Sequence, residues 1–189
     1  MTLSFWLALA AGIGIAAACG LRAFLPLLCL GLAGRFAHLP LDPHVQWLTS
    51  NVSLVALGAA TAIELIGDKI PVVDHVLDVI GSVLRPATAW LGAYAVFVHW
   101  PAPWGAIVAL ILGGGALALH ALRAKLRLGS TFLTAGTANP FISFAEDVMT
   151  LLLSALALFA PFVVLFFVFL WLLVLLRWRR DRARAATAS

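Results

Sequence analysis

Long apolar stretches separated by short polar segments make up most of the chain. The stretches cover residues 3–32, 52–66, 87–100, 104–122, 141–159 and 162–176. A helix needs about 20 residues to cross the roughly 30 Å of hydrocarbon in a bilayer, so the shorter stretches have to include polar flanking residues. The pattern predicts an all-α, polytopic membrane bundle with about six transmembrane helices.

The composition leads to the same class of protein. Hydrophobic residues make up 63% of the 189 residues, charged residues make up 11%, and the mean hydropathy is +1.08. No soluble domain keeps such a balance in solution, so the lipid bilayer is the expected environment. We expect a single transmembrane domain over residues 1–176 and a separate tail over residues 177–189.

This tail is basic. Residues 177–184 include five arginines and one aspartate, a net charge of +4 that equals the formal charge of the whole chain. The local excess predicts a cytoplasmic tail at the anionic headgroups of a bacterial inner membrane, and it argues against nucleic-acid binding. Counting back from this tail places both termini in the cytoplasm and the turn at residues 100–104 outside.

The first apolar stretch is interrupted by Arg22, which lies between Gly20 and Pro26. Proline removes an amide donor and clashes with the carbonyl four residues before it. A break or kink near Arg22 is therefore predicted, with free backbone carbonyls beside the guanidinium group.

Four of the eight acidic residues fall within residues 64–78. Glu64 and Asp68 are four residues apart and share one helical face, and Asp74 and Asp78 do the same in the next segment. An ionisable group at membrane depth costs on the order of 2.5 to 3.5 kcal/mol, so the cluster predicts a binding site for a small ion or a small-molecule substrate. The alternative is that residues 70–84 form an amphipathic helix on the cytoplasmic surface, with solvated aspartates.

Like charges at this spacing repel each other, so the carboxylates need neutralising partners. The candidates are protons, a bound divalent cation, and the side chains of Arg22, Lys69 and Arg85. Oxygen ligands suit magnesium, calcium or manganese, and an added imidazole favours manganese or zinc. His75 lies three residues before Asp78. The predicted metal ligands are therefore Asp74, His75 and Asp78.

A second polar run covers residues 128–147. Asn139 is the predicted N-cap of the following helix and Pro140 its first residue. The small and hydroxylated residues of the run favour a re-entrant loop that lines a cavity, with Asn139 in a supporting role and Glu146 and Asp147 binding the substrate. The alternative is a plain cytoplasmic loop, in which the two carboxylates complement the helix dipole.

The same residues suggest an internal repeat. Six helices with both termini inside divide into two groups of three with opposite orientations. The sequence LRAFL at residues 21–25 recurs as LRAKL at residues 122–126, and Glu64 and Asp68 have a loose counterpart in Glu146 and Asp147. This match suggests a 3+3 inverted repeat.

Three motifs carry a resemblance to a known family. They are the segment from Gly20 to Pro26, the segment from Asp68 to Asp78, and Asn139-Pro140 followed by Ser143, Glu146 and Asp147. Together they resemble the prokaryotic membrane family called domain of unknown function 4126, from about residue 10 to residue 160. The resemblance implies no established activity.

Two weaker similarities concern transport. Residues 64–69 are similar to the Glu-x-Gly-Asp-Lys signature of manganese and calcium exporters, although one extra residue separates Glu64 from Gly67. The region around Asn139 is similar to the second-half motif of lysine-exporter-type transporters. Both families have three plus three helices, which agrees with the predicted number of spans.

These observations favour a small membrane transporter, for a cation or coupled to protons, that uses the carboxylates as ligands or proton carriers. Signatures such as His-Glu-x-x-His and Gly-x-Ser-x-Gly do not occur, so an enzyme is not expected. Two alternatives stay open: a structural or assembly protein whose polar residues pair helices, and a metal-dependent enzyme that acts on lipid. A homodimer is considered because 189 residues are few to enclose a pathway.

Overall fold

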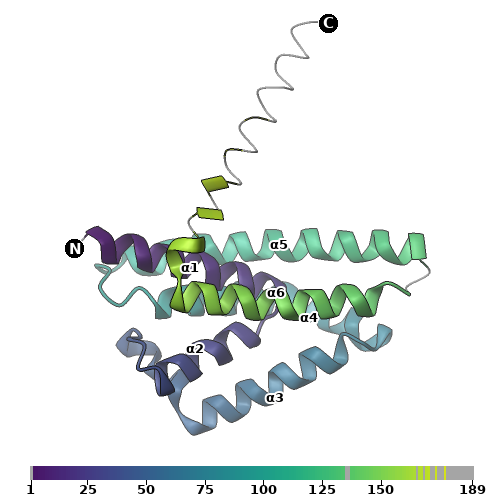
Figure 1. Cartoon of the computed structure of the whole chain (residues 1–189). Helices are drawn as coiled ribbons and strands as arrows, with labels where there is room; N and C mark the ends of the chain where they lie inside the picture. The colour runs from purple at the N-terminus through teal and green to yellow at the C-terminus, as the bar shows by residue number, and fades with distance from the viewer. Residues whose placement is uncertain are drawn as a thin grey trace, which may run out of the picture.

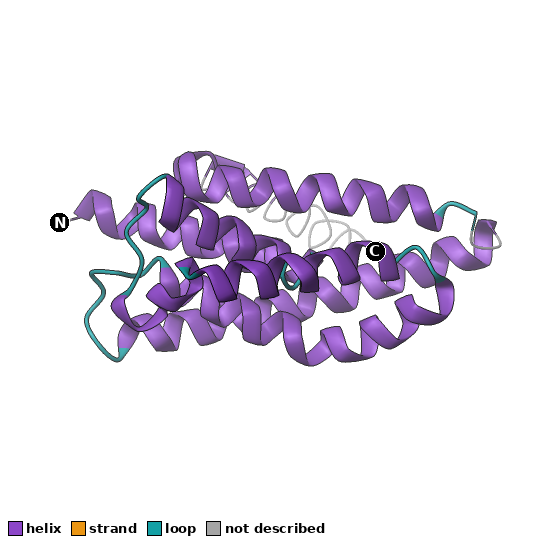
Figure 2. Ribbon diagram, turned by 90° about the horizontal axis from the view of Figure 1, so that it is seen from below, coloured by secondary structure: helices purple, strands orange, loops and turns teal. Residues whose placement is uncertain are grey.

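The computed structural model describes residues 2–134, 137–164, 166–167, 169–170, 173 and 177. Within these ranges the side chains of residues 2, 3, 71, 72, 74, 75, 128, 131 and 132 are not described. The described part is helical and contains no strand, which confirms the predicted all-α class (Figure 2).

Among the described residues up to Phe159, six α-helices and one short 3₁₀ helix follow one another. They are α1 (Thr2–Leu21), α2 (Leu25–Phe36), η1 (Pro43–Thr49), α3 (Asn51–Gly67), α4 (Pro71–Ala95), α5 (Trp104–Thr134) and α6 (Asn139–Phe159). Asp42 begins η1 by accepting a hydrogen bond from the amide of His44, at 3.0 Å, and Ser50 begins α3 by accepting one from the amide of Ser53, at 3.2 Å.

Helix α1 is the central element, because it packs against α4, α5 and α6. Its buried residues are small or slender: Ala10, Ala11, Ile15, Ala16, Ala18 and Cys19. Such residues let helix backbones approach closely, as is typical of membrane bundles. Helices α2 and α3 pack against each other on the lower side of the bundle in Figure 1.

The predicted break near Arg22 is confirmed. α1 ends at Leu21 and α2 begins at Leu25, with a proline in its first turn. In Figure 1 the chain reverses between the two helices, inside the molecule and not at one of its ends. The three residues from Arg22 to Phe24 therefore expose backbone polar groups within the bundle, and these groups need partners.

One local prediction from the sequence is wrong and another alternative stays open. Residues 71–84 are helical, as the first part of the continuous helix α4, which packs against α1 and α5, and their placement on the cytoplasmic surface stays a prediction. Residues 128–147 do not form a re-entrant loop, because α5 continues to Thr134 and α6 begins at Asn139. The hydroxyl group of Thr134 bonds within the helix instead, donating to the carbonyl oxygen of Ser130 at 2.8 Å.

Three of the described helices are long and apolar enough to cross a membrane: Ser4–Leu21, Trp104–Arg127 and Asn139–Phe159. A fourth span is formed if η1 and α3, which are bent by 68° at their junction, count as one. The chain therefore has the helices of a membrane protein. Six spans and the inverted repeat stay predictions.

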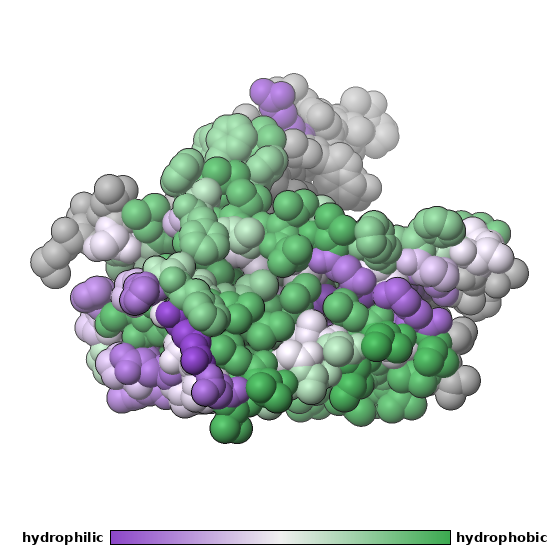
Figure 3. Space-filling view, turned by 60° about the horizontal axis from the view of Figure 1, so that its bottom comes forward, coloured by the Kyte–Doolittle hydropathy of each residue, from purple (hydrophilic) through white to green (hydrophobic). Residues whose placement is uncertain are grey.

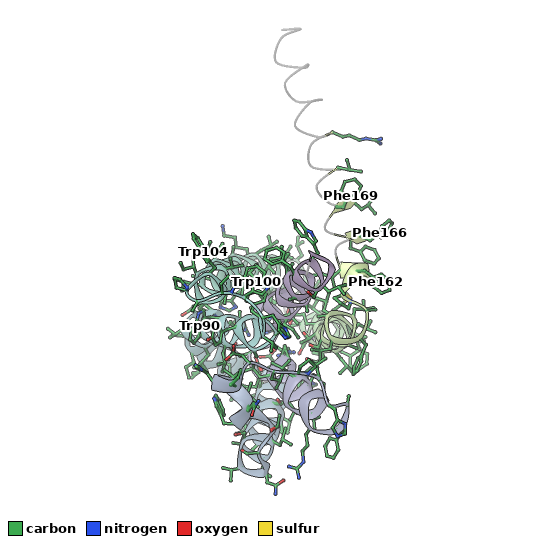
Figure 4. The ribbon with its side chains drawn as sticks, turned by 90° about the vertical axis from the view of Figure 1, so that its left-hand side faces the viewer. Trp90, Trp100, Trp104, Phe162, Phe166 and Phe169 are labelled. Carbon is green, nitrogen blue, oxygen red and sulfur yellow. The ribbon has the colours of Figure 1, made fainter. Side chains whose placement is uncertain are left out.

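One end of the bundle is aromatic. The ring of Phe5, near the start of α1, stacks on Trp100 with 4.3 Å between centroids, and Trp100 stacks on Phe97 at 4.5 Å. Figure 4 shows Trp90, Trp100 and Trp104 on neighbouring parts of α4, α5 and the turn between them. Such rings are typical of the boundary between lipid and water. We call this the aromatic end.

The aromatic end corrects the predicted topology. A cytoplasmic N-terminus and an external turn at residues 100–104 are incompatible, because Phe5 stacks on Trp100 and both lie at the same end of the bundle. The C-terminal tail lies outside the described residues, apart from Arg177, so the prediction of its side is not tested. Beyond α6, Phe162, Phe166 and Phe169 are more than half exposed and lie along one side of their segment (Figure 4).

The first prediction tests whether the start of α1 and the turn at residues 100–104 lie on the same side of the membrane. Single cysteines placed at Thr2 and Ala102 should react with an impermeant thiol reagent from the same side of the membrane. A cysteine at Thr137, in the turn between α5 and α6, should react from the other side. Labelling of positions 2 and 102 from opposite sides would contradict the packing of Phe5 on Trp100.

The second prediction concerns the close approach of α4 and α5. A Cβ atom at Gly113 would lie 2.8 Å from the backbone carbonyl oxygen of Pro86, whereas nothing lies within 4 Å of one at Gly114. Gly113→Ala should therefore lower stability by about 1 kcal/mol or more, because the backbone of α4 has to move. The control Gly114→Ala should be neutral or stabilise by up to about 1 kcal/mol. Thermal unfolding in detergent measures both, and equal behaviour would contradict the close contact.

Candidate functional site

The helix break provides the first part of the site. Glu64 of α3 accepts hydrogen bonds from the backbone amides of Ala23, at 2.9 Å, and Phe24, at 3.3 Å, one with each carboxylate oxygen. These amides belong to the break and the start of α2, where the helix dipole favours a negative charge. Glu64 is buried, with 5% of its surface exposed. A side chain from α3 therefore satisfies the two backbone amides of the break just before α2 begins.

Arg22 connects the break to two further helices. Its side chain is fully buried and forms ion pairs with Asp68, just after α3, and with Asp147 of α6. The same guanidinium group donates to the hydroxyl group of Ser143 at 3.0 Å and to its backbone carbonyl at 3.3 Å. Arg22 thus holds α1, the end of α3 and the start of α6 together.

Asp68 has more arginine partners than any other described carboxylate. Its side chain is fully buried, and its Oδ2 atom accepts from Arg22, from Arg123 at 2.8 Å and from Arg127 at 3.3 Å. The two α5 arginines also reach α6, because Arg123 Nε lies 2.8 Å and Arg127 Nη2 3.6 Å from Glu146 Oε2. Three helices thus meet through Asp68 and Glu146.

A second set of ion pairs involves Arg85 of α4. Arg85 lies 3.8 Å from the carboxylate of Glu64 and 3.7 Å from that of Asp78, and Arg123 lies 3.5 Å from Asp78. Arg85 also donates to Nδ1 of His120, while Nε2 of the same ring lies 3.2 Å from the backbone carbonyl of Asp78. A ring that accepts at Nδ1 and donates at Nε2 is a neutral imidazole.

These contacts join ten charged side chains into one group, which we call the buried ionic network. Its members are Glu64, Asp68, Asp78, Glu146 and Asp147 on the acidic side and Arg22, Lys69, Arg85, Arg123 and Arg127 on the basic side. Five negative and five positive charges cancel, so the described part of the network is neutral. Neutrality is necessary here, because an unpaired charge in this environment costs several kcal/mol.

The basic and the acidic side chains of the buried ionic network are not equally buried. The four arginines are at most 4% exposed. The carboxylates of Asp78, Asp147 and Glu146 are 24%, 17% and 12% exposed, and Lys69 is 48% exposed. Figure 3 shows hydrophilic surface that crosses an otherwise apolar face between two green regions. The network is therefore arginine-rich inside and bordered by carboxylates.

The predicted site residues fall into three groups. Glu64, Asp68, Asp78, Glu146 and Asp147 come together, with Arg22 and Lys69 beside them. Asn139 is the first residue of α6 and is not its N-cap, which is Ala138. The side chains of Asp74 and His75 lie outside the described residues, so the predicted metal site is not tested. Among the described residues, no three His, Cys, Asp or Glu side chains are placed to hold a metal ion.

Sequence reasoning missed part of the basic half of the network. His120, Arg123 and Arg127 were not among the predicted site residues, yet all three are buried. Their spacing of three and four residues places them on one face of α5, in an otherwise apolar helix, while Lys125 on another face is exposed. That spacing was the available signal. Ser143 gave none.

The matching family is described as Domain of unknown function (DUF4126), and the match covers residues 9–180. The chain belongs to this family. No curated protein and no solved structure has significant similarity to it. The weaker exporter similarities have no support from these comparisons.

The third prediction tests the pairing of Arg22. Arg22→Met should lower stability by about 3 to 5 kcal/mol, because it leaves buried carboxylates with fewer cations. Combining it with Asp68→Asn should recover part of the loss, since the double variant is neutral again. Thermal unfolding and yield in detergent measure both. As a control, Arg35→Met removes an exposed arginine of α2, which interacts with Asn51. A fully stable Arg22→Met protein would show that the network does not depend on this pair.

Proposed function

We propose that this protein is a small multi-pass membrane transporter that couples the movement of a solute to the movement of protons. The buried ionic network is its proposed transport site. The observation that carries the proposal is the neutral network at the break between α1 and α2. Broken helices that meet charged residues inside a bundle are typical of the binding sites of transporters. Charged residues in membrane helices are costly and usually functional.

The pattern of shared partners supports a network that can rearrange. Asp68 contacts three arginines, and Arg123 contacts three carboxylates. A group with several partners can lose one contact without leaving a charge alone. Exchange of partners is therefore cheaper here than the breaking of an isolated buried pair, which costs about 3 to 5 kcal/mol.

The carboxylates divide into two sets by burial. Glu64 and Asp68 hold the helix break and the arginines, so we assign them a positioning role. Asp78, Glu146 and Asp147 are partly exposed, so we assign proton uptake and release to them. A proton on one of them would weaken its hold on an arginine, since the ion pair loses its negative member.

Free metal cations are less suited to this network than protons. Each acidic member of the network already has an arginine or a lysine partner. A divalent cation would enter a space that already holds five positive charges. The proposal therefore keeps proton coupling from the sequence analysis and gives up the metal cation as the first choice. Six spans, the inverted repeat, a bacterial inner-membrane location and a homodimer belong to the proposal as well.

A structural or assembly role is the second candidate. The complete cancellation of charge among the described network members favours it, because a network that only joins helices needs no proton exchange. The two candidates differ in one measurable respect: a structural network has no solute-dependent proton movement.

The fourth prediction tests transport. Proteoliposomes containing the protein and a trapped pH-sensitive dye should show proton movement when carboxylic acids, phosphate, amino acids or inorganic cations are added in turn. Asp147→Asn should reduce this movement at least about tenfold, because the side chain can no longer carry a proton. Asp42→Asn is the matched control, since Asp42 lies before η1, outside the network, and its loss of charge is the same.

Each outcome separates the candidates. Proton movement that depends on the protein, on a solute and on Asp147 supports transport. Folded protein without proton movement for any of these solutes would leave the structural role as the better account.

A further inference from the structure

We infer that the solute is an oxyanion, a carboxylate or phosphate group, which binds the buried arginines of the network in place of Asp147 and Glu146. The inference rests on the proposed function of the same site. It names the substrate class, which the sequence analysis left open between a cation and a proton-coupled solute.

The first argument is the number and origin of the arginines. Four of them meet in the network from three helices: Arg22 at the end of α1, Arg85 on α4, and Arg123 and Arg127 on α5. Arginine is the residue that binds carboxylate and phosphate in two-point geometry, and it stays charged when buried. Four buried guanidinium groups therefore form a site whose positive side suits an oxyanion, provided that the anion takes the place of a carboxylate that pairs with them now.

The second argument is the nature of their present partners. Asp147 pairs with Arg22, and Glu146 pairs with Arg123 and Arg127. Both carboxylates stand in adjacent positions at the start of α6, and both are partly exposed. The two side-chain carboxylates make the contacts with the arginines that the carboxylate of a solute would make. An external oxyanion can therefore replace them.

The third argument is unused hydrogen-bonding capacity. Arg22 Nε and Arg85 Nε are buried and have no hydrogen-bond partner among the described residues. A buried donor without an acceptor destabilises the protein, because it has lost its hydrogen bonds to water and gained none in return. An anion with three or four oxygen atoms can accept from more donors than a side-chain carboxylate can.

Charge balance then explains proton coupling. The described network is neutral, so the entry of one negative charge leaves it at −1 unless another charge changes. A proton taken up by Asp147 or Glu146 restores neutrality and releases the arginine that the anion needs. One proton therefore accompanies each negative charge, and the loaded network is again neutral.

The experiment measures anion binding to the purified full chain in detergent, by calorimetric titration with sulfate and with succinate. Sulfate keeps its charge between about pH 5.5 and pH 8, so it reports the titration of the protein alone. Wild-type affinity for sulfate should rise as the pH falls, because protons neutralise the competing carboxylates. Asp147→Asn should bind both anions about tenfold more tightly at pH 7.5, since the internal competitor has lost its charge.

Two further variants make the result specific. Asp42→Asn changes the net charge by the same amount outside the network, so it should bind as the wild type does. Glu146→Gln should also tighten binding, and it carries the test if Asp147→Asn does not fold.

The two possible sources of the oxyanion are separated by nanodiscs: phosphatidylglycerol should weaken sulfate binding, relative to phosphatidylcholine, only if a lipid headgroup occupies the site.

The outcomes separate the inference from the proposed function. No binding of either anion and no stabilisation by phosphatidylglycerol, or unchanged affinity in both network variants, would overturn the oxyanion site. Anion binding that tightens in the variants, without any solute-dependent proton movement, would support the site and contradict transport. Proton movement driven only by cations would contradict the site alone.

Discussion

The positive charge of Arg22 at the break between α1 and α2 is the constraint on which the rest of the arrangement depends. A guanidinium group cannot lose its proton to avoid burial, so it has to be surrounded by carboxylates. α3 supplies Glu64 for the open amides of the break, and Asp68 just after it pairs with Arg22. α6 supplies Asp147, and the remaining members of the network balance these carboxylates in turn.

This requirement links the helices in a way that apolar packing alone does not. Packing of Ala and Gly residues on α1 is close but has little specificity, since many small residues along a helix fit the same groove. The ion pairs fix the register of α3 and α5 against the break after α1, because a shift by one turn would separate Asp68 from its three arginines. The pairs of Arg85 with Glu64 and of Arg22 with Asp147 do the same for α4 and α6. The network therefore specifies which residues meet, while the apolar residues provide most of the burial.

The helical class, the break at Arg22 and the gathering of Glu64 and Asp68 could be predicted, because each depends on local rules of proline, hydropathy or helical spacing. The contribution of α5 was missed: the spacing of His120, Arg123 and Arg127 places them on one helical face, but the spacing alone does not tell a buried face from a surface one. The loop predicted over residues 128–147 failed for a related reason: Ser and Thr that suit a loop also bond to the carbonyl four residues earlier in a helix. The sequence combined a cytoplasmic N-terminus with an external turn at residues 100–104 because charge counting could not detect the stacking of Phe5 on Trp100.

Helix α6 combines two kinds of attachment in one element. Near its end, Ala157 packs so closely on α1 that a Cβ atom at Gly14 would lie 2.6 Å from the Ala157 side chain. Near its start, Glu146 and Asp147 contact the network through ion pairs that depend on their charge. Close apolar packing does not respond to protons, whereas an ion pair does. In the proposed function, a change in the charge of either carboxylate acts on the start of α6, while the close packing of Ala157 holds its end.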